Sequence, residues 1–218
     1  MAFRLAIFDF DGTLADSFPC LLRALNAAAA RYGFRPIDDR EVGELRGRSP
    51  WEVMEHIDVG TWQLPMIMHF VRERMAREID AVALFPGIHE VLEDLASHGT
   101  RIAIVSSNSE RNIRHVLGAR LASLACDYRC DVSMFGKRPK LRQVLAATGV
   151  CAADAIAIGD EVRDLRAARG ESIPFCAVTW GFTTAPALIA AAPDYVVASV
   201  EDLVGVVTRS APLPAPPE

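Results

Sequence analysis

Short, almost wholly apolar runs alternate with helical stretches along most of this 218-residue chain. Such runs are typical of strands that are covered on both faces, as in a parallel sheet. The alternation therefore predicts an α/β fold with a doubly wound, Rossmann-like parallel sheet. The expected strands are Arg4–Phe10, Arg101–Val105, Ala155–Ile158, Phe175–Thr179 and Tyr195–Ala198, with a weaker candidate at Asp131–Phe135. The expected helices are Ile88–Ser97, Arg111–Leu117, Leu141–Thr148, Val162–Arg169 and Ala187–Ala191.

Residues 17–84 interrupt this rhythm, because they contain helical patterns and no convincing strand. Pro86–Gly87 then gives a turn signal. We therefore expect a helical insert at 17–84, placed after the first strand of a core formed by 1–16 and 85–209. Residues 210–218 are rich in proline and are expected to form a disordered tail.

Charge and hydropathy exclude several classes of function. The net charge of −5 argues against a nucleic-acid partner, and no apolar window is long enough to span a bilayer. Carboxylates at Asp9 and Asp11 do not fit a secretory signal peptide. The five cysteines lack the spacing of a zinc site and are expected to be reduced thiols in the cytoplasm.

Two pairs of carboxylates follow predicted strands. Asp9 and Asp11 come directly after the first strand, and Asp160 and Asp164 follow Ala155–Ile158, four residues apart at the start of a helix. Ligands bind at the carboxyl ends of parallel strands. If the two strands are neighbours, the carboxylates converge on a site suited to Mg²⁺. Each pair also has a simpler explanation, namely a turn after the first strand and acids that favour a helix dipole after the second.

The strand Arg101–Val105 is followed by Ser106-Ser107-Asn108-Ser109. Ser106 comes first after the strand, so it is placed to donate a hydrogen bond to an anion at the same sheet edge. Ser107 or Ser109 is expected to cap the next helix, since Ser107 and Glu110 have capping-box spacing.

These motifs, read in order, resemble those of the haloacid dehalogenase-like superfamily: DFDGTLADS, a serine after an apolar strand, a lone lysine and GDEVRD. The resemblance is closest to phosphoglycolate-phosphatase-like members and covers nearly the whole chain. It implies that the helical insert is a small cap. It also implies that Asp9 is the nucleophile of an aspartyl-phosphate and that Asp11 is the acid and base. Mg²⁺ would be held by Asp9, the backbone carbonyl of Asp11 and Asp160, with support from Asp164.

The resemblance further implies that Ser106 and Thr13 position the phosphoryl group, with Gly12, Ser107 and Asn108 beside it. The chain has only two lysines among its 23 cations, Lys137 and Lys140. The family pattern fits Lys137, whose compact charge would suit a position between two anions. Lys140 is expected to face solvent.

The inferred function is Mg²⁺-dependent hydrolysis of a small phosphorylated metabolite, with phosphoglycolate suggested by the resemblance alone. Arg46, in a basic loop of the insert, is a candidate contact for a carboxylate or phosphate of the substrate, although a solvated loop between helices is the simpler interpretation. A phosphomutase shares all four motifs and is the nearest alternative. A non-catalytic binding relative is a further alternative, which the intact Asp9, Asp11, Lys137 and Asp160 disfavour.

Overall fold

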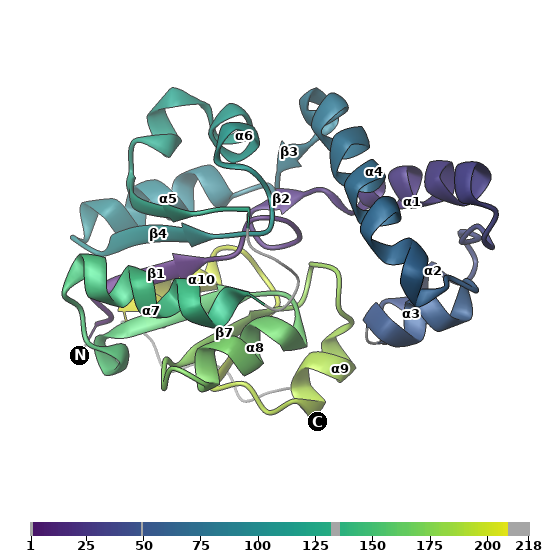
Figure 1. Cartoon of the computed structure of the whole chain (residues 1–218). Coiled ribbons are helices and arrows are strands. Elements are labelled where there is room, and N and C mark those ends of the chain that lie inside the picture. The colour runs from purple at the N-terminus through teal and green to yellow at the C-terminus, as the bar shows by residue number, and fades with distance from the viewer. Residues whose placement is uncertain (1, 49, 132–135, 209–218) are drawn as a thin grey trace.

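A six-stranded parallel sheet forms the centre of the molecule (Figure 1). The structure, a computed structural model, describes residues 2–48, 50–131 and 136–208. The strand order is β5-β4-β1-β6-β7-β8, and each neighbouring pair is parallel. The strands are β1 (Leu5–Phe8), β4 (Arg101–Val105), β5 (Ala125–Arg129), β6 (Ala155–Gly159), β7 (Phe175–Val178) and β8 (Tyr195–Val197).

Helices cover both faces of this sheet, which confirms the doubly wound fold. Ala6 and Phe8 of β1 pack into one apolar cluster, whereas Leu5 and Ile7 pack into another, because successive side chains of a strand point to opposite faces. The first cluster includes α5 (Ile88–Ser97), α6 (Glu110–Ala122) and α10 (Asp202–Thr208). The second includes α7 (Lys137–Thr148), α8 (Val162–Arg169) and α9 (Ala185–Ala190).

The helical segment, which we define as residues 17–82, lies beside the sheet and is joined to it by a short ladder (Figure 1). β2 (Ala15–Asp16) enters the segment and β3 (Ala83–Leu84) leaves it, and these two strands pair antiparallel. The segment has its own cluster of buried apolar side chains, which includes Ala28, Ile57 and Ile67. Its helices are α1 (Phe18–Tyr32), α2 (Val42–Leu45), α3 (Pro50–His56), η1 (Thr61–Gln63), α4 (Leu64–Arg77) and η2 (Ile79–Ala81).

The structure differs from the sequence prediction at three strands, one α-helix and one 3-10 turn. The edge strand beside β4 is Ala125–Arg129, whereas the predicted strand at Asp131–Phe135 falls, from residue 132 onward, outside the described residues. β5 is mixed in polarity because, as an edge strand, most of it is only half-buried. The paired β2 and β3 have two residues each, too few for a periodic signal. The helix α10 and the 3-10 turn η3 (Ala152–Asp154) were also not predicted.

The proline-rich stretch 210–218 lies outside the described residues. Among the helices that the structure does describe, none combines the length and apolar character needed to cross a membrane.

Candidate active site

Asp9 is the first residue after β1, at the carboxyl end of the sheet. The residue is 6% exposed, and its Oδ1 accepts a hydrogen bond from the Phe10 N–H at 2.7 Å. The chain then turns through Gly12, whose φ of +79° favours glycine. A Cβ on Gly12 would also lie 2.3 Å from Oδ2 of Asp160, so a larger residue would displace that carboxylate.

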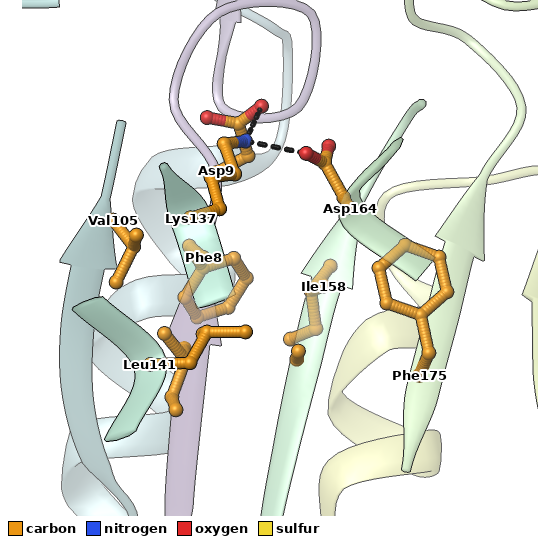
Figure 2. A pocket seen from close by; sticks show the side chains of 10 residues that line it. Phe8, Asp9, Val105, Lys137, Leu141, Ile158, Asp164 and Phe175 are labelled. Carbon is orange, nitrogen blue, oxygen red and sulfur yellow. Dashed lines mark ion pairs between the residues drawn. The ribbon is translucent and has the colours of Figure 1, made fainter. Parts of the chain in front are cut away.

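Lys137 extends its ammonium group between two carboxylates. Its Nζ lies 2.6 Å from Oδ2 of Asp9 and 2.7 Å from Oδ1 of Asp164 (Figure 2). Burial alone would lower the pKa of Lys137, but the carboxylates of Asp164 and Asp9 outweigh this effect and raise it. Lys140, one turn further along α7, is half-buried.

A cavity of about 20 Å³ lies below this ion pair. Apart from the three charged groups, its walls are apolar, as the phenyl rings of Phe8 and Phe175 illustrate (Figure 2). The space corresponds to one water-sized group. The Lys137 ammonium is therefore enclosed by two carboxylates and by apolar side chains, with room beside it for about one water molecule.

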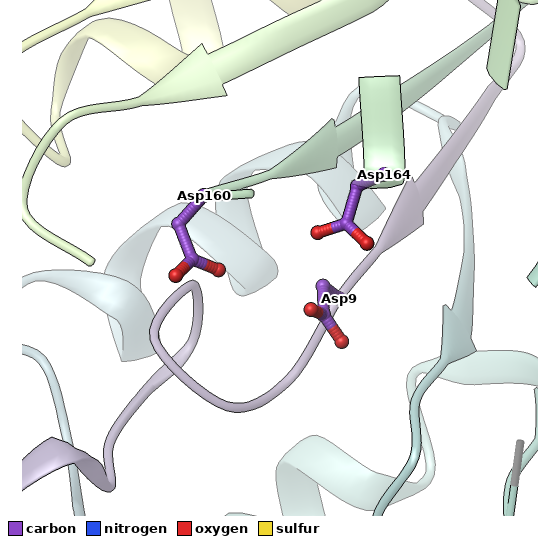
Figure 3. A group of neighbouring side chains, drawn as sticks. All are labelled: Asp9, Asp160 and Asp164. Atoms are coloured by element: carbon purple, nitrogen blue, oxygen red, sulfur yellow. The ribbon is translucent and has the colours of Figure 1, made fainter. Parts of the chain in front are cut away.

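Asp9, Asp160 and Asp164 form a buried carboxylate group (Figure 3). One oxygen of each lies within 4.8 Å of the others. Burial raises the pKa of Asp9 to about 7, even though the adjacent Lys137 ammonium lowers it. Burial also raises the pKa of Asp160 well above its ordinary value, and nearby carboxylates add to the shift. Such crowding of negative charge away from water favours the binding of a cation.

Asp160 is held by two donors. Its Oδ1 accepts a hydrogen bond from the Thr13 hydroxyl at 2.7 Å, and its Oδ2 accepts one from the Phe182 N–H at 2.7 Å. The loop after β7 is itself fixed to the loop after β1, because Trp180 Nε1 donates to the Thr13 carbonyl at 3.1 Å. The role of Thr13 in the structure is thus to orient Asp160.

Asp11 lies on the other side of the turn and contacts Asn108. The Asn108 side-chain amide donates to both Asp11 oxygens, at 3.3 and 3.2 Å. Burial raises the pKa of Asp11, although this hydrogen bond lowers it. Ser106 is fully buried, and its Oγ accepts a hydrogen bond from the Asn108 N–H at 3.1 Å. Ser106 therefore helps to place Asn108, which in turn places Asp11.

The other residues of this loop differ in position. Ser107 is half-buried beside Asn108. Ser109 is the residue that caps α6, since its hydroxyl accepts a hydrogen bond from the Asn112 N–H at 3.3 Å. The capping box expected from Ser107 and Glu110 is not the one that the structure uses.

Arg46, predicted as a substrate contact, instead bonds to the core in this structure. Its Nε donates to the Phe182 carbonyl at 3.1 Å, and its Nη2 donates to the Gly181 carbonyl. Contact of Arg46 with a substrate stays a prediction. The Arg46 side chain is half-buried, whereas Gly47 and Arg48 of the same loop are exposed. The loop 180–182 was missed by sequence reasoning, although its place directly after β7, at the carboxyl edge of the sheet, was an available signal.

A further ion pair at the site, between Arg163 and Glu161, was also missed. Arg163 Nε donates to Oε2 of Glu161 at 2.5 Å, between the two predicted carboxylates Asp160 and Asp164. Burial raises the pKa of Glu161, although Arg163 lowers it. Glu161 and Arg163 stand inside the GDEVRD motif, between its two aspartates, and their opposite charges two residues apart are the signal for this pair.

Comparison with known proteins identifies a family and several relatives of this chain. The family model described as haloacid dehalogenase-like hydrolase matches residues 6–178. The phosphoglycolate phosphatase of Synechococcus elongatus is 36% identical over 204 residues, covering 93% of this chain and 96% of the relative. The phosphoglycolate phosphatase of Caulobacter vibrioides is 30% identical over 203 residues, covering 82% of this chain and 80% of the relative.

Solved structures share the fold. A haloacid dehalogenase-like family hydrolase from Streptococcus pneumoniae superposes with a TM-score of 0.79 at 24% identity, covering 94% of this chain and 98% of the other. CbbY from Rhodobacter sphaeroides, solved in complex with phosphate, gives a TM-score of 0.68 at 23% identity, covering 89% and 93%. At these identities the likeness concerns the arrangement of the elements.

Proposed function

Because this chain belongs to the haloacid dehalogenase-like hydrolase family, we propose that it is a Mg²⁺-dependent phosphatase that hydrolyses phosphoglycolate through an aspartyl-phosphate on Asp9. One observation carries the chemistry: a buried carboxylate at the end of β1 touches an ammonium group and lies within 4.8 Å of two further carboxylates. The names of the Synechococcus and Caulobacter relatives support the substrate.

Asp9 is the proposed nucleophile. Its Oδ1 is held by the Phe10 N–H, and its Oδ2 is held by Lys137, so the carboxylate is oriented before any substrate arrives. In the first step, an Asp9 oxygen forms a bond to phosphorus while the bond from phosphorus to the leaving oxygen breaks. Lys137 offsets negative charge on Asp9 and on the incoming phosphoryl group, which transfer between anions requires.

Asp11 is the proposed acid and base. Protonated Asp11 gives its proton to the leaving oxygen, and the resulting carboxylate then takes a proton from the water that hydrolyses the aspartyl-phosphate. Burial raises the pKa of Asp11, which favours the protonated form that the first step needs. Asn108 holds the carboxyl group in place through both oxygens.

The donor set of Asp9, Asp160 and Asp164 fits Mg²⁺. Each of the three residues offers a carboxylate oxygen, and all three side chains are buried. Mg²⁺ prefers such hard oxygen ligands and keeps several waters besides. We propose that Asp9, Asp160 and the backbone carbonyl of Asp11 hold the ion, with Asp164 in support. When bound, the ion supplies positive charge that offsets the charge of the phosphoryl oxygens.

The proposed cap comprises residues 17–84, that is, the helical segment together with β3, and lies between the two parts of the core. Its helices stand beside the site and its Arg46 reaches the loop above Asp160. We further propose a cytoplasmic location, which the five free cysteines support.

A phosphate-release assay tests the function. Purified protein with Mg²⁺ should release phosphate from 2-phosphoglycolate with a kcat/KM about tenfold above that for sugar phosphates or nucleotides. An EDTA-treated sample is the control. Release of no phosphate from any member of the panel, including aryl phosphates, would refute the phosphatase. Transfer of phosphate to a second sugar hydroxyl would indicate a phosphomutase instead.

Thermal unfolding at different pH tests the electrostatics of the metal site. Because the pKa of Asp9 is raised from its ordinary 3.8 to about 7, the folded protein binds more protons than the unfolded chain within this interval. Without metal, ionised Asp9 therefore costs stability progressively as the pH rises from 3.8 to about 7. The Tm of Asp9→Asn minus the Tm of wild type should grow over this range, and Mg²⁺ should raise the wild-type Tm most at high pH.

A Tm difference that stays constant from low to neutral pH would contradict this account of Asp9. Asp202→Asn, a change of the same kind on the exposed surface of α10, is the control and should show no such trend.

A further inference from the structure

Arg46 connects the helical segment to the core loop 180–184. Its guanidinium donates to the carbonyls of Gly181 and Phe182, and its own carbonyl accepts a hydrogen bond from the Thr184 N–H at 3.1 Å. The guanidinium carbon also lies 5.3 Å from the centre of the Phe18 ring. That ring contacts Phe182 edge-on, with centroids 5.4 Å apart. Hydrogen bonds in both directions and an aromatic contact thus seat the end of α2 on this loop.

The bond that joins Gly181 to Phe182 connects Arg46 with Asp160. The carbonyl of this peptide group accepts from Arg46, and its N–H donates to Oδ2 of Asp160 at 2.7 Å. A cation at the carbonyl polarises the peptide, so its N–H becomes a stronger donor to the carboxylate. One peptide unit therefore lies between a side chain of the helical segment and the proposed metal ligand.

The loop at Gly181 also packs closely against Asp160, so a movement of the loop changes the surroundings of that carboxylate. A Cβ built on Gly181 would lie 2.2 Å from the Asp160 Cβ and 2.4 Å from the Gly12 carbonyl oxygen. The loop thus rests directly against the Asp160 side chain, with no room for a side chain between them. A shift of the loop therefore moves the Phe182 N–H relative to Oδ2 of Asp160. Oδ1 of Asp160 meanwhile stays hydrogen-bonded to the Thr13 hydroxyl.

We propose that Arg46 is a positioning residue for the metal site: its contact with the Gly181–Phe182 peptide orients Asp160, so that seating of the helical segment on the core strengthens the binding of Mg²⁺. This rests on the proposed function in that Asp160 is taken as a Mg²⁺ ligand. In this proposal Arg46 affects the metal site through the Gly181–Phe182 peptide and needs no contact with the substrate.

Mg²⁺ titration by calorimetry, without substrate, tests the proposal. Arg46→Met keeps the aliphatic stem over Phe18 but removes all donors, and it should weaken Mg²⁺ binding about tenfold, as loss of an outer partner of a ligand does. Arg46→Lys restores one charged donor and should recover part of the loss. Arg48→Met is the matched control, because Arg48 lies in the same loop and pairs with Glu44 at the surface. Its Mg²⁺ affinity should stay within about twofold of wild type.

The outcomes separate the alternatives. Unchanged Mg²⁺ affinity in Arg46→Met together with a raised KM would make Arg46 a substrate contact and overturn the proposal. Equal weakening in Arg48→Met would also overturn it, because loop charge alone would then explain the effect. If Arg46→Met does not fold, Arg46→Lys must still bind Mg²⁺ more weakly than wild type, by less than the tenfold expected for Arg46→Met. Wild type that binds Mg²⁺ but hydrolyses no phosphate ester refutes the function alone, whereas wild type that binds no Mg²⁺ refutes this inference.

Discussion

Asp9→Asn should abolish phosphate release, lowering kcat by roughly 10⁴-fold or more, as removal of a nucleophile does in other enzymes with a covalent step. The amide has nearly the shape of the carboxylate and can still accept from the Phe10 N–H, so the fold around β1 should persist. The change replaces the nucleophilic carboxylate with a neutral, weakly nucleophilic amide and removes the negative charge facing Lys137. Initial rates of phosphate release at saturating Mg²⁺, with circular dichroism as a check of folding, measure the effect.

Asp202→Asn serves again as the control and should retain wild-type turnover, because Asp202 is exposed on α10, in the C-terminal part of the chain. Asp9→Asn with a rate close to wild type would mean that Asp9 forms no covalent intermediate. In that case a different residue, or a contaminating phosphatase, produces the phosphate.

Lys137→Arg should lower kcat/KM about 100-fold, although it preserves the charge, a loss similar to that of one essential donor in an active site. The ammonium lies 2.6 and 2.7 Å from two carboxylates, above a cavity of about 20 Å³. The longer, planar guanidinium cannot occupy this position without moving Asp9 or Asp164. Steady-state kinetics with 2-phosphoglycolate measure the loss.

Lys140→Arg is the matched control, since it makes the same substitution one turn away on α7 at a half-buried position. We expect its kcat/KM to stay within about twofold of wild type. Loss of activity in Lys140→Arg, with Lys137→Arg unaffected, would show that Lys140 is the catalytic lysine. The proposed roles of Asp9, Asp160 and Asp164 would not be affected by that result.

The sequence contains enough to predict the sheet and the residues at its carboxyl edge. Strands covered on both faces consist of apolar residues almost throughout, so β4 (Arg101–Val105) could be delimited to the residue. Asp9 and Asp160 each follow such a strand directly, and pairing of β1 with β6 brings these strand ends together. Local order along the chain therefore already specifies this part of the site.

Contacts between distant loops could not be predicted in this way. Arg46 and the Gly181 carbonyl are far apart in sequence, and their meeting depends on how the helical segment packs against the core. The edge strand β5 was misplaced for a related reason: with solvent near it, it lacks the continuous apolar run that marks a central strand. Hydrophobic periodicity reports burial within an element and says little about which loops meet.

The antiparallel ladder between β2 and β3 bears on how such a protein can diversify. Because Ala15 pairs with Leu84, the chain leaves the core and returns to it at adjacent positions. The residues between β2 and β3 therefore form one long loop that closes a two-stranded ladder. The entropic cost of closing a loop grows slowly with its length, by about 0.6 kcal/mol for each doubling. Insertions, deletions or a wholesale exchange of the connecting helices thus impose a small thermodynamic burden on the scaffold. Selection can alter recognition at this junction while the reacting groups are inherited unchanged.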